Sequence, residues 1–118
     1  MALRRVVVTG LGALTPVGNT AADYWQGLVN GKSGAAPITR FDAEKFRTKF
    51  ACEVKNFDAE DHFDRKEARK MDPFTQYALV VAEEAVKDSS LDLDKINLDK
   101  AGVIWGSGIG GLKTFQDE

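Results

Sequence analysis

The sequence predicts an α/β fold with parallel strands, and three observations lead to this prediction. Two short apolar segments, residues 4–9 and 101–105, have the composition of strands covered on both faces. Each segment is followed by a run that is rich in glycine. Two helices are predicted between them, and the order strand, helix, irregular segment, helix, strand is typical of layered α/β proteins.

The N-terminal segment, residues 4–9, predicts a strand because three valines follow one another at positions 6–8. β-branched residues in succession are favoured in a strand that is buried on both sides. A tight loop with three glycines and a proline follows over residues 10–18.

A short helix is predicted over residues 21–29. Asn19 or Thr20 can cap its N-terminus, because both side chains can accept a hydrogen bond from a free backbone N–H group. Its apolar residues fall on one stripe, and Asn30 and Gly31 are typical of a helix C-terminus.

The middle of the chain has weaker patterns. Residues 31–48 predict an irregular excursion, and residues 50–54 predict a short strand. Residues 58–70 are strongly charged, and we expect them to be helical or turn-like.

The strongest helix signal begins at Asp72, a good N-cap, followed by Pro73 at the first helical position. Apolar residues then recur at helical spacing: Phe74, Tyr77, Ala78, Val81, Ala85 and Val86. Ser89 and Ser90 end this helix, and a polar connection, residues 91–99, leads to the second apolar segment.

Two strands of the central type cannot have both faces covered by two helices and a loop. We therefore expect residues 1–118 to be one incomplete N-terminal part of a larger α/β domain.

Composition narrows the function classes. A net charge of −2 and 43% hydrophobic residues describe a globular protein, and we expect it to bind neither nucleic acid nor a membrane surface. The N-terminal apolar run is too short for a signal peptide, so we expect a cytoplasmic location. A single cysteine rules out an internal disulfide within this chain.

Two glycine motifs resemble phosphate-binding loops, but neither fits. Gly10 and Gly12 follow an apolar segment, yet Thr15 stands where a dinucleotide fingerprint needs a small third residue. The run GSGIGG, residues 106–111, lacks the Gly-Lys-Ser/Thr ending of a P-loop. We therefore expect no cofactor, and a nicotinamide-dependent oxidoreductase is a disfavoured alternative.

Cys52 and His62 lack a convincing catalytic setting. Cys52 stands beside an acid, Glu53, which disfavours a thiolate, and a plain strand residue is the more common case. His62 lies in a charged segment, where a solvated histidine is usual. One cysteine and one histidine also make a transition-metal site improbable, so we expect no metal.

A basic cluster lies in the charged segment: Arg65, Lys66, Arg69 and Lys70. In a helix these residues share one side and can meet an acidic partner. Four acidic residues balance the charge over residues 61–72, so an ordinary solvated surface is the alternative.

Ile109 is a bulky apolar residue among four glycines. It can act as a wall or gate of an apolar pocket, although a residue that fills the core is the more common case.

Four stretches together point to a known family: RRVVVTGLGALTPVGN (4–19), FDAEKFRTKFACEVKNFD (41–58), RKEARKMDPFTQYAL (65–79) and GSGIGGL (106–112). In this order they resemble the N-terminal portion of the β-ketoacyl-acyl-carrier-protein synthase II family. These are condensing enzymes of bacterial fatty acid synthesis.

The resemblance implies a thiolase-like layered α/β fold, a homodimer and an acyltransferase activity. It implies decarboxylative condensation, in which a malonyl thioester on acyl carrier protein attacks an acyl chain held on a cysteine. In the family the nucleophilic cysteine and two histidines lie beyond the part matched here. We therefore expect no catalytic residue in this chain, and we expect residues 1–118 to be inactive alone.

Two sites carry over by resemblance. Arg65, Lys66, Arg69 and Lys70 match the surface that binds acyl carrier protein. Gly108, Ile109 and Gly110 match the acyl pocket. Two alternatives stay open: a ketosynthase or chain-length factor of a polyketide pathway, and a carrier-protein-binding module without catalysis.

Overall fold

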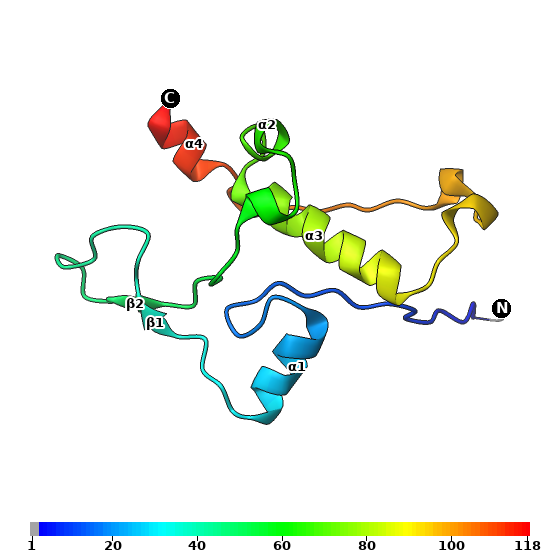
Figure 1. Ribbon diagram of the computed structural model, residues 1–118, viewed down its shortest axis with the longest axis horizontal. Coiled ribbons are helices and arrows are strands. Elements are labelled where there is room, and N and C mark those ends of the chain that lie inside the picture. Colours follow the sequence, from blue (N-terminus) through cyan, green and yellow to red (C-terminus); the bar gives the residue numbers. More distant parts are fainter. Residues whose placement is uncertain (1–2) are drawn as a thin grey trace.

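The computed structural model describes residues 3–118, which contain four α-helices, three single 3₁₀ turns and one two-stranded ladder. The helices are α1 (Ala21–Val29), α2 (Arg65–Ala68), α3 (Pro73–Asp88) and α4 (Leu112–Asp117). The strands are β1 (Ala36–Pro37) and β2 (Phe50–Ala51), and the 3₁₀ turns are Ala59–Asp61, Leu93–Lys95 and Leu98–Lys100. In Figure 1, α3 runs through the middle of the molecule, and α1 and the hairpin of β1 and β2 lie beside it.

The predicted helix over residues 21–29 is confirmed at both ends as α1. The Thr20 hydroxyl accepts a hydrogen bond from the Asp23 N–H group, 3.1 Å away, which caps the N-terminus. Gly31 ends the helix with φ of +64°, a left-handed conformation that glycine adopts without a steric penalty.

The main helix, α3, is also confirmed. Asp72 is its N-cap residue and Pro73 its first residue, as the sequence predicts. The helix ends where Ser89 and Ser90 stand, and Ser90 has φ of +52°. These start and stop signals are local, so sequence alone places both ends.

The charged segment is helical and turn-like, as expected. Asp58 caps the 3₁₀ turn Ala59–Asp61, and Asp64 caps α2. The Asp64 carboxylate accepts from the N–H group of Lys66 at 2.7 Å.

The strand predictions for residues 4–9 and 101–105 are wrong for the described chain, because neither segment takes part in a ladder. The one ladder within residues 3–118 is antiparallel and pairs Ala36 with Ala51 and Pro37 with Phe50. The strand expected over residues 50–54 is limited to β2. A strand needs a hydrogen-bonded neighbour, and a buried-type composition does not supply one.

Both apolar segments nevertheless lie against α3. A groove of about 350 Å³ beside this helix is lined by Thr9 at the end of the first segment, by Gly10 in the loop that follows, and by Val103 and Trp105 from the second segment. Gly12 allows the close approach of its loop, because a β-carbon there would stand 2.1 Å from the Val81 carbonyl oxygen on α3.

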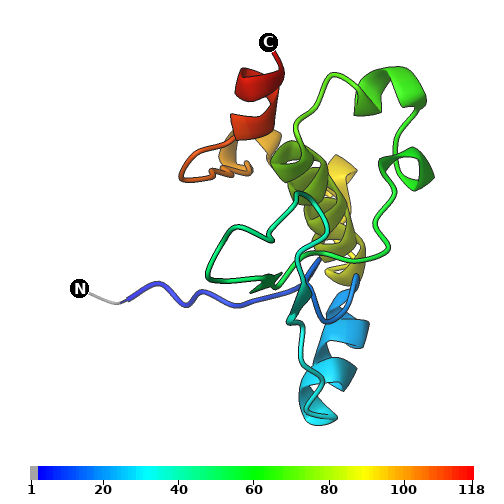
Figure 2. The same cartoon turned by 90° about the vertical axis from the view of Figure 1, so that its left-hand side faces the viewer.

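The molecule is open, as Figures 1 and 2 show. Its radius of gyration is 17.6 Å, whereas a compact chain of this length has about 13.5 Å. Its accessible surface is 10184 Å², against about 6,300 Å² for a compact monomer of this mass. The apolar side chains that are buried within residues 3–118 are Ala68 and Ala78.

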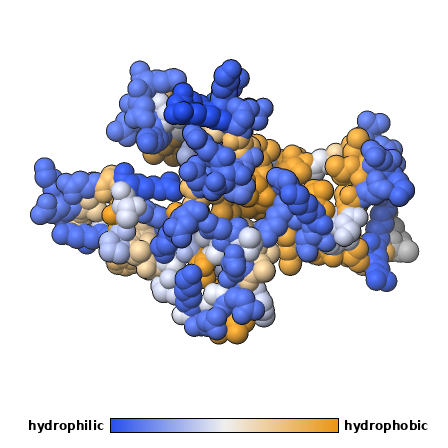
Figure 3. Space-filling view, in the orientation of Figure 1, coloured by the Kyte–Doolittle hydropathy of each residue, from blue (hydrophilic) through white to orange (hydrophobic). Residues whose placement is uncertain are grey.

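Much apolar surface is therefore uncovered. Val6 is 89% exposed and Ile104 is fully exposed. Figure 3 shows apolar atoms gathered at the surface over α3 and beyond its C-terminal end, while α2 and the hairpin are mostly hydrophilic. Among residues 3–118, no helix has the length and apolar character needed to cross a bilayer.

Candidate functional site

The predicted basic residues are all exposed, in and just after α2. Arg65 and Lys66 lie in the helix, Arg69 is its C-cap residue and Lys70 follows in the next turn. We call these four residues the basic surface. Arg65 pairs with Glu60 at 3.4 Å, and within residues 3–118 no ion pair is formed by the other three side chains.

The basic surface is attached to α3 through the C-terminal end of α2 and the residues that follow it. Ala68, on the inner side of α2, is buried. The Gln76 side chain on α3 donates to the carbonyl oxygens of Ala68 at 2.9 Å and Met71 at 3.2 Å. These two bonds fix the C-terminal end of α2 to the first turns of α3, because they satisfy carbonyl groups that a short helix leaves free.

The second predicted site lies in residues 106–111, which we call the glycine segment. It approaches the same end of α3: a β-carbon at Gly110 would stand 2.6 Å from the Phe74 ring. A β-carbon at Gly106 or Gly108 would meet nothing within 4 Å. The segment is therefore packed at its end and open at its start.

Ile109 is 76% exposed and lines an open pocket of about 240 Å³. The other walls include Phe74 and Tyr77 of α3 and Arg40, whose guanidinium donates to the Tyr77 hydroxyl oxygen at 2.9 Å. The pocket combines aromatic and aliphatic walls with three charged residues, Arg40, Asp72 and Lys113, so its apolar part suits a small apolar group. The neighbouring residues Gly108 and Gly110 leave the Ile109 side chain free of crowding.

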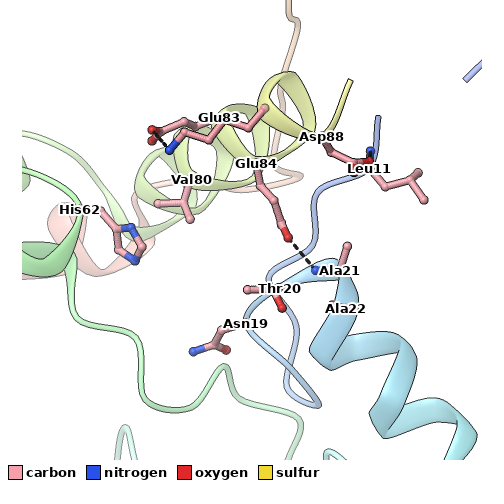
Figure 4. A pocket seen from close by; sticks show the side chains of 11 residues that line it. Leu11, Asn19, Thr20, Ala21, Ala22, His62, Val80, Glu83, Glu84 and Asp88 are labelled. Atoms are coloured by element: carbon pink, nitrogen blue, oxygen red, sulfur yellow. Dashed lines mark hydrogen bonds and ion pairs between the residues drawn. The ribbon is translucent and has the colours of Figure 1, made fainter. Parts of the chain in front are cut away.

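An open pocket of about 550 Å³ lies between α1, His62 and α3 (Figure 4). Its acidic groups already have partners. Glu84 accepts from the N–H groups of Ala13 at 2.7 Å and Ala21 at 2.8 Å, and Asp88 accepts from that of Leu11 at 2.8 Å. These carboxylates hold the glycine-rich loop and the start of α1 on α3, so their role is structural.

Two carboxylates have lowered pKa values. The Lys87 ammonium, 2.6 Å from Glu83, lowers the pKa of that carboxyl by hydrogen bonding and by its charge. The Thr39 hydroxyl, 2.7 Å from Glu53, lowers the pKa of Glu53 by hydrogen bonding. Both groups are ionised and exposed, and neither is set up as a general acid or base.

Cys52 and His62 are not brought together. Cys52 is exposed just after β2, and the His62 ring stacks on Phe57 with ring centres 5.4 Å apart. No group of three or more histidine, cysteine or acidic side chains in the described part of the chain could hold a metal ion.

The sequence did not indicate the residues that connect the two sites. Asp72 is recognisable only as a helix cap, and Gln76 only as a polar position on a helix. Their partners, Thr114 and Ala68, come from other parts of the chain. No local pattern in the sequence signals contacts of this kind.

The chain matches a protein family over nearly all of its length. The model described as "Beta-ketoacyl synthase, N-terminal domain" matches residues 3–118. Two proteins named 3-oxoacyl-[acyl-carrier-protein] synthase 2 are similar to it, one from Synechocystis sp. (strain ATCC 27184 / PCC 6803 / Kazusa) and one from Staphylococcus aureus (strain COL). Each is 52% identical, over 98% and 96% of this chain, and the chain spans 28% and 27% of their lengths.

A solved structure is also similar: the ishigamide ketosynthase/chain length factor, with a TM-score of 0.69 and 40% identity. The match covers 81% of this chain and 24% of that one. The predicted thiolase-like α/β fold class is thereby confirmed, with this chain as one part of the fold.

Proposed function

Because this chain belongs to the β-ketoacyl synthase family, through that family's N-terminal domain, we propose that it is the N-terminal part of a β-ketoacyl-acyl-carrier-protein synthase of fatty acid elongation. The observation that carries the proposal is the 52% identity to two synthases over at least 96% of the chain. The exposed apolar surface supports it, because the remainder of a larger domain would cover that surface.

The proposed reaction is a decarboxylative condensation. An acyl chain is first transferred to a cysteine thiolate as a thioester. Malonyl-acyl carrier protein then loses carbon dioxide, and the electron pair left on its α-carbon attacks the thioester carbonyl. A carbon–carbon bond forms, and the cysteine leaves as a thiolate. The cysteine and the groups that stabilise the enolate oxygen belong to the remaining part of the enzyme.

In this proposal the basic surface binds acyl carrier protein. Arg65, Lys66, Arg69 and Lys70 are exposed together at α2, and their charge suits an acidic partner. Lys66, Arg69 and Lys70 contribute most, because Arg65 already pairs with Glu60.

The glycine segment lines the acyl pocket in this proposal. Ile109 presents its side chain to the chain being elongated, and Gly108 and Gly110 give it room. Apolar volume at such a point changes discrimination between chain lengths by about 1–3 kcal/mol.

The intact enzyme is proposed to be a cytoplasmic homodimer. It binds acyl carrier protein and a second copy of the same chain, and its substrates are acyl and malonyl thioesters. We propose that it binds neither nucleic acid nor a membrane. It needs no cofactor, because the condensation is driven by loss of carbon dioxide.

The test is reconstitution of the enzyme that contains this segment. We expect the full-length protein to convert acyl thioester and malonyl-acyl carrier protein to a 3-oxoacyl product two carbons longer, detected by mass spectrometry. Residues 1–118 alone should give none. A full-length protein that carries the acyl chain but never condenses it would contradict the proposal.

A second candidate is a ketosynthase or chain-length factor of a polyketide pathway, favoured by the similarity to the ishigamide ketosynthase/chain length factor. Its identity of 40% is lower than the 52% of the synthases. Repeated condensation without reduction between cycles would favour this candidate, whereas one condensation per reduced acyl chain would favour fatty acid elongation.

A third candidate, a carrier-protein-binding module without catalysis, requires the chain to fold by itself. The open shape and exposed valines weigh against it. A cooperative thermal transition of residues 1–118 alone, together with binding of carrier protein, would favour this module.

A further inference from the structure

Asp72 stands at the junction of the two proposed sites. It follows the basic surface and is the N-cap residue of α3, yet its side chain makes no capping hydrogen bond. The N–H groups of Thr75 and Gln76 bond instead to its backbone carbonyl, at 2.9 and 3.1 Å. An aspartate at this position usually caps its own helix, so the carboxylate here is available for another contact.

That carboxylate is directed at the end of the glycine segment. Its Oδ1 atom accepts a hydrogen bond from the Thr114 hydroxyl in α4. Its Oδ2 atom lies against Gly111, where a β-carbon would come within 2.7 Å. Gly111 has φ of +67°, so both the space and the backbone conformation require glycine there. Two oxygens of one side chain therefore contact two points of one short segment.

The same turn of α3 also contacts α2. Phe74 packs on Gly110, and Gln76 donates to the carbonyl oxygens of Ala68 and Met71. Figures 1 and 2 show α2 and α4 on either side of this end of α3. The first turns of α3 are thus the common support of the basic surface and of the glycine segment.

Ile109 has no comparable support of its own. Its side chain is 76% exposed, and a β-carbon on its neighbour Gly108 would meet nothing within 4 Å. A run of glycines restricts its backbone weakly. The position of Ile109 therefore depends on the anchors that follow it, which are the contacts of Gly110 with Phe74 and of Gly111 and Thr114 with Asp72.

We infer that Asp72 is a positioning residue that sets acyl-chain selectivity by fixing the glycine segment through Thr114. This inference rests on the proposed function, since it assigns a consequence to the proposed acyl pocket. Asp72 is itself among the residues that line this pocket, but we assign its effect on selectivity to its contacts with Gly111 and Thr114, which position Ile109. Without the anchor, Ile109 occupies a range of positions and discriminates less between chain lengths.

The test uses the full-length enzyme with the variants D72A, D72N and T114V and the double variant D72A/T114V. The readout is the ratio of kcat/KM between the preferred acyl chain and one about four carbons longer. D72A and T114V should each move this ratio toward one by roughly fivefold or more. D72N should retain most of the wild-type ratio, because its amide oxygen can still accept from Thr114.

The double variant should shift the ratio no further than D72A alone, because the contact that T114V removes is one of those that D72A already removes. D92A is the matched control: Asp92 also caps a helical turn, but it lies outside the pocket and should leave the ratio unchanged. If the D72A variant does not fold, T114V alone tests the inference. It should fold, because valine has the shape of threonine and position 114 is exposed.

A folded T114V enzyme with the wild-type ratio would overturn the inference, as would additive effects in the double variant. A wild-type enzyme that condenses no acyl chain would instead refute the proposed function. The two failures are therefore distinguishable.

Discussion

At the scale of single residues, the Glu84 side chain connects two parts of the chain to α3. Its two oxygens accept from the N–H groups of Ala13 and Ala21, which lie in the glycine-rich loop and at the start of α1. Glu84→Ala leaves both N–H groups without this acceptor. We expect a loss of about 2 kcal/mol in the free energy of unfolding of the full-length enzyme, measured by chemical denaturation.

The adjacent acid, Glu83, is the matched control. It is exposed and pairs with Lys87 one turn along the helix. Exposed pairs of this kind contribute little to stability, because water and salt screen them. The Glu83→Ala variant should therefore have a free energy of unfolding close to that of the wild type. Equal destabilisation by the two variants would mean that the contacts to the loop are unimportant.

Ile109 gives a second prediction at this scale. Ile109→Phe adds apolar volume to the proposed acyl pocket. In the full-length enzyme we expect kcat/KM for long acyl chains to fall by roughly tenfold more than for short chains. Competition assays with acyl thioesters of two lengths would measure this. An unchanged dependence of kcat/KM on chain length would show that Ile109 does not contact the acyl chain.

Asp72 illustrates the limit of residue-level prediction. The local pattern Asp-Pro predicts that Asp72 is the N-cap residue of α3, and the structure confirms this. Its carboxylate, however, bonds to Thr114, 42 positions further along. That choice depends on how the glycine segment returns to α3, and no neighbouring residue encodes it.

At the scale of elements, α2 presents the basic surface, and its proposed role can be tested by charge reversal. In the full-length enzyme, Lys66→Glu and Arg69→Glu should each weaken binding of acyl carrier protein by roughly tenfold at low salt. The wild type should lose affinity with added salt more steeply than either variant, because it has more charge to screen. Titration calorimetry at two ionic strengths would measure both effects.

Lys100→Glu provides the control for net charge, since Lys100 is exposed in a separate 3₁₀ turn. It should bind carrier protein as the wild type does. Unchanged affinity in both α2 variants would exclude the basic surface as the docking site.

The two longer helices could be predicted from this sequence, whereas α4 was not predicted and, of the three predicted strands, residues 50–51 alone pair within the described chain. Thr20 and Gly31 mark the ends of α1, and Pro73 and Ser89 mark those of α3, all by local chemistry. A strand is completed by a partner, and residues 4–9 have none within the described chain. Their valines predict burial, but burial needs other elements as well.

At the scale of the whole molecule, the open shape gives a further prediction. An accessible surface of 10184 Å² leaves little apolar burial to offset the conformational entropy of folding. The isolated chain, residues 1–118, should therefore lack a cooperative thermal transition and should bind a hydrophobic dye such as ANS. A sharp transition without dye binding would contradict this expectation.

The position of Trp105 has a practical consequence. Trp105, which lines the α3 groove, is 52% exposed, and Trp25, on α1, is 63% exposed. Indole emission shifts to shorter wavelength when water leaves the ring. In a Trp25→Phe variant, the emission maximum of Trp105 therefore reports whether another polypeptide covers this side of α3. A shift to shorter wavelength indicates that it does.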